Sequence, residues 1–418
     1  MNLREFKELE PLELNKMISV KRITGILHNA YINRTKKVNL IIANTHVYPN
    51  TCTPLSGIID FYKERGVKTN LIFLEGESYY GTRLNLLEPF SVEDENNNQK
   101  LDDPFNKIWT FETPGGETKL VSALLSSLRR TELCGEGTFR GLEWCLNETM
   151  DNVLVHSNSG KGFVMAQYHQ SNKLFSVCIY DNGIGIFNSF LNSKHHPKKP
   201  LDAITLALGE KITRDEKVGQ GNGLWGLYRI VEENKGKLRI ISDGAYYEMR
   251  FERGNPKQTN IDDWNKNNLI SGLGTTIIDF QLSVDNDMDI EKAIPDSNLI
   301  DVWEENLENS NGDHILKISE LSKGTGTRPA ALEMRNIALN LAIHNNNKVI
   351  FDFEGIGTLS SSYADELIGK LISDYGIVFF NRKFDIINLN KTNLIILERS
   401  VKMRLAQSYY DEKINEDE

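Results

Sequence analysis

Three polar side chains recur at four-residue intervals within the segment ETMDNVLVHSNSG, which spans residues 148–160. On a helix, Glu148, Asn152 and His156 would form one stripe, because residues four apart are neighbours on a helix surface. Phosphoryl transfer needs a divalent ion that offsets charge on the phosphate oxygens and a carboxylate within reach of the attacking hydroxyl or water. A glutamate one helical turn from an asparagine can provide both. His156 has two explanations that the sequence does not separate. It can be part of the site, or it can simply interact favourably with a helix C-terminus.

Two glycine-rich segments follow this stripe. The apolar stretch LFSVCIY predicts a buried strand that runs into DNGIGI, where Asp181 supplies a hydrogen-bond acceptor and Gly183 and Gly185 permit close backbone approach. The segment GQGNGLWGLYRIVEENKG predicts a loop that leads into an amphipathic helix and contains the glycines Gly219, Gly221 and Gly223. Successive backbone N–H groups at a helix N-terminus form an anion site, and phosphate is its usual occupant. The second segment lacks the ending of a P-loop, so its phosphate site would be of another type.

Taken in order, these elements resemble the GHKL ATP-binding fold shared by DNA gyrase, MutL and the histidine and anti-sigma-factor kinases. The resemblance covers about residues 118–283 and is nearest the anti-sigma-factor serine kinases. Glu148 and Asn152 match the family's N-box, and DNGIGI and GQGNGLWGL match its two glycine boxes. Thr275 takes the position of the threonine near adenine. The resemblance implies ATP and Mg²⁺ as cofactors.

The resemblance also implies a role for each residue. Asn152 would bind Mg²⁺ through its amide oxygen, Asp181 would accept a hydrogen bond from the adenine amino group, and Glu148 would be the catalytic base. The loop 219–223 would surround the phosphates. The implied cofactor-binding set is therefore Asn152, Asp181, Gly183, Gly185, Gly219, Gly221, Gly223, Leu224 and Thr275.

A basic, turn-rich stretch lies between the two glycine boxes. It contains NSKHHPKKP and ITRDEK, and the latter includes Arg214 and directly follows Lys211. These two cations would contact phosphate if the stretch forms an ATP lid, and they would face water if it is a solvated surface loop. The sequence leaves both interpretations open.

The chain as a whole is predicted to be mixed α/β, with a central α/β sandwich flanked by two small α/β domains. A strand within residues 37–49, a helix within 54–66 and a strand within 67–76 predict a β-α-β unit. The polar segment at 91–104 predicts a surface loop. The expected divisions are an N-terminal domain at 1–115, the ATP-binding domain at 116–283, an acidic linker at 284–312, a C-terminal α/β domain at 313–410 and a disordered tail at 411–418.

The C-terminal domain alternates strands and helices and resembles the STAS-like domains found beside or fused to such ATPases. In the related anti-anti-sigma-factor fold, a strand leads through a turn to a serine that is phosphorylated. Here FDFEGIGTLSSSYADEL places Ser362 at that serine, and Ser360 stands where that fold has an aspartate. Ser362 has a second interpretation, because with Asp365 three residues later it forms a helix-capping pair.

The composition excludes several classes of protein. A net charge of −10 and a pI near 5.5 oppose a large phosphate-tracking surface, so a nucleic-acid partner is not expected. No stretch approaches the roughly 20 apolar residues of a membrane span, and the first residues lack the apolar core of a signal peptide, so we expect a cytoplasmic protein. The cysteines are too widely spaced for a metal site and are expected to be buried, reduced thiols: Cys52, Cys134, Cys145 and Cys178.

We therefore expect a regulatory switch that acts as an ATPase or a serine/threonine kinase. Its nucleotide state would control the flanking α/β domains and their contacts with a protein partner or a second copy of the chain. Residues 115–147 contain no histidine, which excludes the phospho-accepting helix of a histidine kinase. The alternative is a nucleotide-gated interaction module without turnover. The phosphoryl acceptor can be water, Ser362 or another protein.

Overall fold

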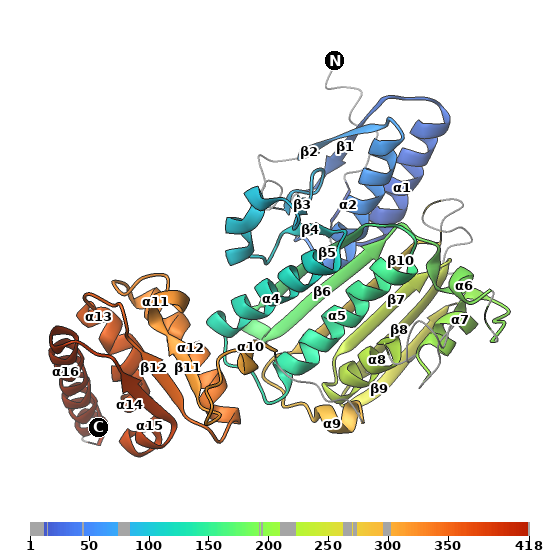
Figure 1. Ribbon diagram of the computed structural model, residues 1–418. Coiled ribbons are helices and arrows are strands. Elements are labelled where there is room, and N and C mark those ends of the chain that lie inside the picture. Colours follow the sequence, from blue (N-terminus) through green and yellow to red (C-terminus); the bar gives the residue numbers. More distant parts are fainter. Residues whose placement is uncertain are drawn as a thin grey trace. The chain divides into compact units, whose positions relative to one another are not determined.

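The computed structural model describes most of the chain, namely residues 12–14, 16–43, 46–73, 84–191, 193, 195–209, 223–261, 270, 274–295 and 302–416. The chain forms two compact units: the first comprises residues 1–125 and 137–297, and the second residues 126–136 and 298–418. Both units are mixed α/β, as expected (Figure 1). All four cysteines are buried, as predicted, and none of them is in a disulfide. Within the described ranges, no helix is long and apolar enough to cross a membrane.

The first unit is built around an eight-stranded sheet in the order β3-β4-β5-β6-β10-β7-β8-β9. Its strands are β3 Phe90–Ser91, β4 Ile108–Phe111, β5 Gly162–His169, β6 Leu174–Asp181, β7 Lys237–Ser242, β8 Ala245–Glu252, β9 Asn255–Ile261 and β10 Thr276–Ser283. Neighbouring strands are antiparallel except β3 and β4. Because β10 lies between β6 and β7, the first residue of β10 is beside the last residue of β6, where the first glycine box begins.

Helices pack on both faces of this sheet. They are α1 Met17–Ile32, α2 Pro49–Glu64, α4 Pro114–Thr131, α5 Thr138–His156 and α8 Gly223–Glu233. Figure 1 shows α4, α5 and α8 running across one face. The helices α1 and α2 share a hydrophobic core with the sheet residues Phe163, Met165, Cys178, Tyr180, Ile241 and Ile277. Since successive strand residues point to opposite faces, Asp181, which follows Tyr180, points away from α2.

The N-terminal segment forms the expected β-α-β unit, but the structure groups it with the large sheet. β1 (Lys37–Ile42) and β2 (Lys68–Phe73) are parallel neighbours connected through α2. The expected boundary at residue 115 is not a boundary between units, because β3 and β4 belong to the eight-stranded sheet and α2 packs on β5 and β6. Two parallel strands cannot bury both of their faces alone, so they share their core with the larger sheet. The segment 91–104 includes a 3₁₀-helix at Glu95–Asp102, where we expected a loop.

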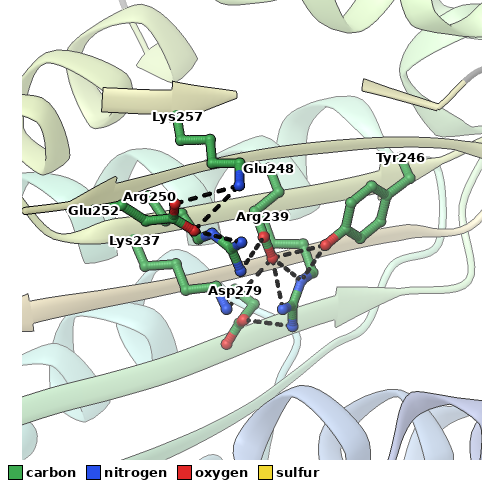
Figure 2. Close-up of polar contacts among 8 residues, drawn as sticks. All are labelled: Lys237, Arg239, Tyr246, Glu248, Arg250, Glu252, Lys257 and Asp279. Carbon is green, nitrogen blue, oxygen red and sulfur yellow. Dashed lines mark hydrogen bonds and ion pairs between the residues drawn. The ribbon is translucent and has the colours of Figure 1, made fainter. Parts of the chain in front are cut away.

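An ion-pair network joins strands β7, β8 and β10 (Figure 2). Arg239 on β7 lies 2.8 Å from Glu248 on β8 and 3.2 Å from Asp279 on β10. The Tyr246 hydroxyl donates to Glu248 at 2.7 Å, and Lys237 lies 3.3 Å from the same carboxylate. Burial alone would raise the pKa of Glu248, but hydrogen bonds from Tyr246 and Arg239 and the charge of Lys237 lower that pKa to about 2. The network therefore stabilises the sheet while Glu248 is ionised.

The second unit contains a parallel three-stranded sheet in the order β11-β12-β13. Its elements are α10 Val302–Glu305, β11 His314–Lys317, α11 Ile318–Leu321, α12 Arg328–His344, β12 Val349–Asp352, α13 Ser361–Ala364, a π-helical turn at Asp365–Gly369, α14 Lys370–Tyr375, α15 Ile377–Lys383, β13 Phe384–Ile387 and α16 Lys391–Glu416. The strands and long helices follow the expected order, and α15 is an addition to it. Helix α16 also includes residues 411–416, which we expected to be disordered. The expected linker contains α10 and, in the first unit, α9 (Ile290–Ala293).

The second unit also holds the end of α4. The side-chain amide of Asn340 on α12 donates to the backbone carbonyls of Arg129 at 3.2 Å and Glu132 at 2.8 Å, and its oxygen accepts from the N–H of Cys134 at 2.9 Å. The last carbonyls of a helix have no partner within the helix. Asn340 is buried and satisfies these groups, which explains why residues 126–136 belong to this unit although they precede most of the first unit in sequence.

Candidate functional site

Helix α5 carries the predicted polar stripe. Glu148, Asn152 and His156 are all half-buried, whereas the neighbouring Met150 and Val153 are buried in the core. The side-chain amide of Asn152 donates to the backbone carbonyl of Glu148 at 2.5 Å. This bond fixes the amide against the helix, so its orientation does not depend on a ligand. His156 is the last residue of the helix.

The end of the second glycine box lies against this stripe. Gly223 is the first residue of α8, and a Cβ atom at this position would lie 2.7 Å from Oε2 of Glu148 and 3.3 Å from Nδ2 of Asn152. Any other residue would therefore displace the carboxylate. The N-terminus of a helix of 11 residues, which favours anions, is thus next to a carboxylate and an amide. Leu224 packs against a small cluster from α6 (Gly185–Phe190) and α7 (Pro200–Ala207), formed by Phe190, Ala203 and Ala207.

The first glycine box lies at the C-terminal end of α5, the helix that carries the stripe. Asp181 ends β6, and its Oδ1 accepts a hydrogen bond from the backbone N–H of Gly183 at 2.8 Å. The N–H of Ile184 donates to the carbonyl of Ser157, the residue after α5, at 2.8 Å. A side chain at Gly183 would collide with that carbonyl. The sequence places the stripe and this box 25 residues apart, and the structure brings them together at one end of α5.

Asp243 anchors the first glycine box from a different part of the chain. It lies in the two-residue turn between β7 and β8, with a φ of +52° followed by +82° at Gly244, which is typical of a tight hairpin. Its Oδ2 accepts from the N–H of Phe187 at 2.7 Å, and its Oδ1 accepts from the side-chain amide of Asn188 at 3.1 Å. A Cβ at Gly185 would lie 2.5 Å from Asp243 Oδ1. The residues Ser-Asp-Gly predict a turn, but nothing in the sequence shows that this carboxylate reaches a box 56 residues away.

The segment before β10 completes the surroundings of Asp181. Residue Thr276 is paired with Asp181 across β10 and β6, so the two side chains share a face of the sheet, and the Thr276 hydroxyl donates to the Asp181 carboxylate. Thr275, the residue that the sequence resemblance indicates, is buried directly before the strand. A side chain at Gly274 would collide with the carbonyl of Ile184, so this segment also packs tightly on the first glycine box.

The two aspartates of this region are desolvated. Burial raises the pKa of Asp181 to about 7, although hydrogen bonds from Gly183 and Thr276 oppose the shift, and the charge of Asp243 adds to it. Burial likewise raises the pKa of Asp243 to about 6, against the hydrogen bonds from Phe187 and Ser242. A ligand that donates a hydrogen bond to Asp181 would favour its ionised form.

Two further acidic residues, Glu117 and Asp151, lie near Glu148 of the stripe. Burial raises the pKa of Glu148, and the charge of Asp151 raises it further. Glu117, in the first turn of α4, is 6% exposed, and burial followed by the charges of Asp151 and Glu148 raises its pKa to about 7. The sequence did not single out Glu117, because an acidic residue in a first helical turn is already explained by the helix dipole. These carboxylates are partly buried and repel one another, and a bound cation would relieve this repulsion.

Several predicted residues lie outside the part of the chain that the structure describes: Gly219, Gly221, Lys211 and Arg214. Their roles remain predictions. Among the described residues, the structure brings Glu148, Asn152 and Gly223 together directly. It places Asp181, Gly183 and Gly185 at the end of the same helix through the bond to Ser157.

Comparison with known families identifies part of the second unit. Residues 331–394 match the family described as "STAS-like domain of unknown function (DUF4325)". This stretch is a STAS-like domain. It runs from α12 into the start of α16 and confirms the fold that the sequence predicted for the C-terminal part. No curated protein matches the chain.

The structure of the STAS-like domain contradicts the prediction that Ser362 caps a helix. The residue that caps helix α13 is Ser360, whose hydroxyl accepts from the N–H of Tyr363 at 3.0 Å. The capping interpretation of Ser362 is therefore wrong, because the helix begins at Ser361 and Ser362 is an exposed residue within it. Asp365, its expected capping partner, instead binds Arg404 through two hydrogen bonds of 2.8 and 2.5 Å.

Proposed function

We propose that the first unit binds ATP–Mg²⁺ as a GHKL-type nucleotide-binding domain and that the chain is an ATPase or serine/threonine kinase-like regulatory switch. The observation that carries this proposal is the contact of Gly223 with the stripe on α5, where a Cβ would lie 2.7 Å from Oε2 of Glu148 and 3.3 Å from the amide of Asn152. A carboxylate and an amide beside the N-terminus of a helix are the groups that a metal-bound phosphate chain requires.

Each residue has a role that its surroundings support. Asp181 is a buried acceptor at a strand end, suited to an exocyclic amino group such as that of adenine. Glu148 accepts a proton from the attacking hydroxyl or water, and its raised pKa brings it closer to neutrality, where a general base is most effective. Asn152 offers a hard oxygen ligand of the kind that Mg²⁺ prefers, and the like-charged carboxylates around it suit a cation. When bound, Mg²⁺ would offset charge on the phosphate oxygens.

One observation favours the alternative, a nucleotide-gated interaction module without turnover. Burial and the charge of Asp151 raise the pKa of Glu148, and any fraction of Glu148 that is protonated cannot act as a base. The protein would then bind nucleotide and change its contacts without transferring phosphate.

The second unit supplies the surface that a switch would control. Two side chains of α15 in the STAS-like domain, Ile377 and Val378, are 51% and 79% exposed, which suits contact with a protein partner or a second copy. The acceptor of the phosphoryl group would be water, the exposed Ser362 or a residue of the partner. Buried thiols that form no disulfide suit a reducing compartment, and we assign the protein to the cytoplasm.

Incubation with γ-labelled ATP and Mg²⁺, followed by separation of free phosphate from labelled protein, tests this function. We expect label in phosphate or protein from the wild type and a loss of about 10² to 10⁴ in rate for Glu148→Gln. Glu112→Gln, at an exposed glutamate of the same unit, is the matched control and should keep the wild-type rate. An ATP-dependent rise in melting temperature without turnover would support the alternative. The absence of any response to ATP would refute both functions.

A further inference from the structure

Asp243 lies in the hairpin turn between β7 and β8, but its carboxylate binds the first glycine box. This bond is not needed to close the hairpin. The hairpin between β7 and β8 is closed by its backbone, with positive φ at both central residues. The carboxylate instead extends to another segment, where it accepts from the N–H of Phe187 at 2.7 Å and from the amide of Asn188 at 3.1 Å. The hydroxyl of the preceding residue, Ser242, accepts from the N–H of Ile186 at 3.0 Å. Two adjacent side chains of the hairpin thus bind consecutive residues of the glycine box and the helix after it.

The position of Gly185 depends on the same carboxylate. Its φ is +78°, and a Cβ there would lie 2.1 Å from the carbonyl oxygen of Gly274 and 2.4 and 2.5 Å from the two carboxylate oxygens of Asp243. Asn188 binds both Asp243 and, at 2.8 Å, the carbonyl of Ile184, so it closes the turn around Gly185. The turn between Asp181 and α6 is therefore held by hydrogen bonds from two sides, by Ser157 on α5 and by Asp243 on the hairpin, and Gly274 before β10 packs against it from a third.

We propose that Asp243 is a positioning residue for nucleotide recognition: by fixing the turn at Gly185, it holds Asp181 where that residue distinguishes a 6-aminopurine from a 6-oxopurine. The inference rests on the proposed function, because it requires that Asp181 accepts from the adenine amino group. Asp243 itself does not touch the nucleotide. Its contribution is geometric, since a hydrogen bond to a carboxylate loses most of its strength when the donor and acceptor are misaligned.

The substitution that removes this anchor without opening the hairpin is Asp243→Gly. Glycine adopts positive φ freely, so the hairpin keeps its backbone while the carboxylate is lost. The chain offers a matched control in the hairpin between β8 and β9, where exposed Arg253 and Gly254 have φ values of +51° and +81°. Arg253→Gly makes the same change of backbone freedom at the same kind of turn. Asp243→Asn keeps one oxygen acceptor and tolerates positive φ, so it serves as the conservative variant.

The measurement is the dissociation constant of ATP–Mg²⁺ and of inosine triphosphate–Mg²⁺, which carries an oxo group in place of the amino group. It is made at pH 8.5, above the pKa of about 7 of Asp181, and removal of the Asp243 charge lowers that pKa further, so the ionised form of Asp181 is favoured in the variants as well. We expect the wild type and Arg253→Gly to prefer ATP by about 10- to 100-fold, the usual effect of a hydrogen bond to a charged group. Asp243→Gly should bind both nucleotides with nearly equal affinity, and Asp243→Asn should recover part of the preference.

The outcomes separate the inference from the function on which it rests. A general loss of stability would lower the affinity for both nucleotides equally and leave the preference unchanged. An unchanged preference in folded Asp243→Gly would therefore overturn the inference while leaving the proposed ATP binding intact. A wild type that binds neither nucleotide would overturn the proposed function itself. If Asp243→Gly does not fold, Asn188→Ala removes the exposed partner of the same anchor and should reduce the preference by about 2- to 5-fold. No reduction in that variant would also overturn the inference.

Discussion

Replacing Gly223 by alanine tests the contact between α5 and α8 on which the proposed site depends. The new Cβ would lie 2.7 Å from Oε2 of Glu148, whereas ordinary contacts begin at 3.4 Å, so the carboxylate must move by about 0.7 Å (3.4 − 2.7). The atom that must move is the far end of a flexible side chain, which makes the steric cost to folding small. Gly223 is the first residue of α8, so only a fraction of the about 1 kcal/mol by which alanine is preferred over glycine in a helix interior applies. The variant should therefore be as stable as the wild type or more so.

The effect on catalysis should be opposite. A displacement of about 1 Å of a catalytic group can cost about 10²-fold in rate, so a shift of about 0.7 Å in the base should lower turnover by about 10- to 100-fold. The same Cβ would lie 3.3 Å from the amide of Asn152, which disturbs the group expected to bind Mg²⁺. The combination of unchanged or higher melting temperature with lower turnover is specific to this contact, because most damaging substitutions reduce both.

The assay compares phosphate release at saturating ATP–Mg²⁺ with the melting temperature for Gly223→Ala and a control. Gly25 lies within helix α1, and a Cβ there would meet nothing within 4 Å. Gly25→Ala should thus gain helix stability without any change in turnover. If Gly223→Ala hydrolyses ATP within about twofold of the wild type, while Glu148→Gln is inactive, the position of Glu148 beside α8 has no part in the chemistry and the reasoning fails.

Three further predictions concern binding, capping and pH. At an ATP–Mg²⁺ concentration of about 100 times the dissociation constant, the wild type should gain roughly 2.7 kcal/mol of stability, and Asp181→Ala should lose most of this gain in a melting experiment. Ser360→Ala should cost about 1 kcal/mol in denaturant unfolding because it removes the cap of α13, whereas Ser362→Ala should change stability by less than about 0.5 kcal/mol. Glu248 has a folded-state pKa of about 2 against about 4.3 in an unfolded chain, so its contribution is present above pH 4.3 and is lost as the pH falls toward 2. Melting temperatures between pH 5 and 2 should accordingly fall more steeply for the wild type than for Glu248→Gln.

Local patterns in the sequence predicted the elements that carry the site. The four-residue spacing of Glu148 and Asn152 gave the stripe on α5, and apolar runs beside glycines gave the ends of β6 and the start of α8. The same patterns gave the β-α-β unit and the C-terminal α/β fold. These features depend on residues close together in the chain, so their periodicity and turn chemistry are visible without a structure.

The groups that the sequence did not reveal act over long sequence separations. Asp243 accepts a hydrogen bond from an N–H 56 residues away. The pKa of Glu117 is raised in part by the charge of Glu148, which lies 31 positions later in the chain. Their residue types are also ordinary for a turn and a first helical turn, so each had a sufficient local explanation. The assignment of the cap to Ser362 failed for another reason. Three consecutive serines can each begin a helix, and only the hydrogen bond from Tyr363 to Ser360 shows which one does.

The raised pKa values make one last prediction about the ligand-free protein. Asp181 and Glu117 both have pKa values of about 7, so each is partly protonated at neutral pH. A hydrogen bond from an adenine amino group requires the ionised form of Asp181, and a cation beside Glu148 lowers the pKa of nearby carboxyls such as Glu117. Binding of ATP–Mg²⁺ at pH 7 should therefore release protons, and the affinity should rise as the pH increases from 6 to 8.

Titration calorimetry in buffers with different ionisation enthalpies measures that release directly. The wild type should release protons at pH 7, and Asp181→Asn should release fewer, because only the carboxyls near Glu148 still change their protonation. Proton uptake on binding would contradict the prediction, since it would mean that the ligand favours the protonated carboxyls. Release that is equal in the wild type and Asp181→Asn would show that the nucleotide base does not contact Asp181.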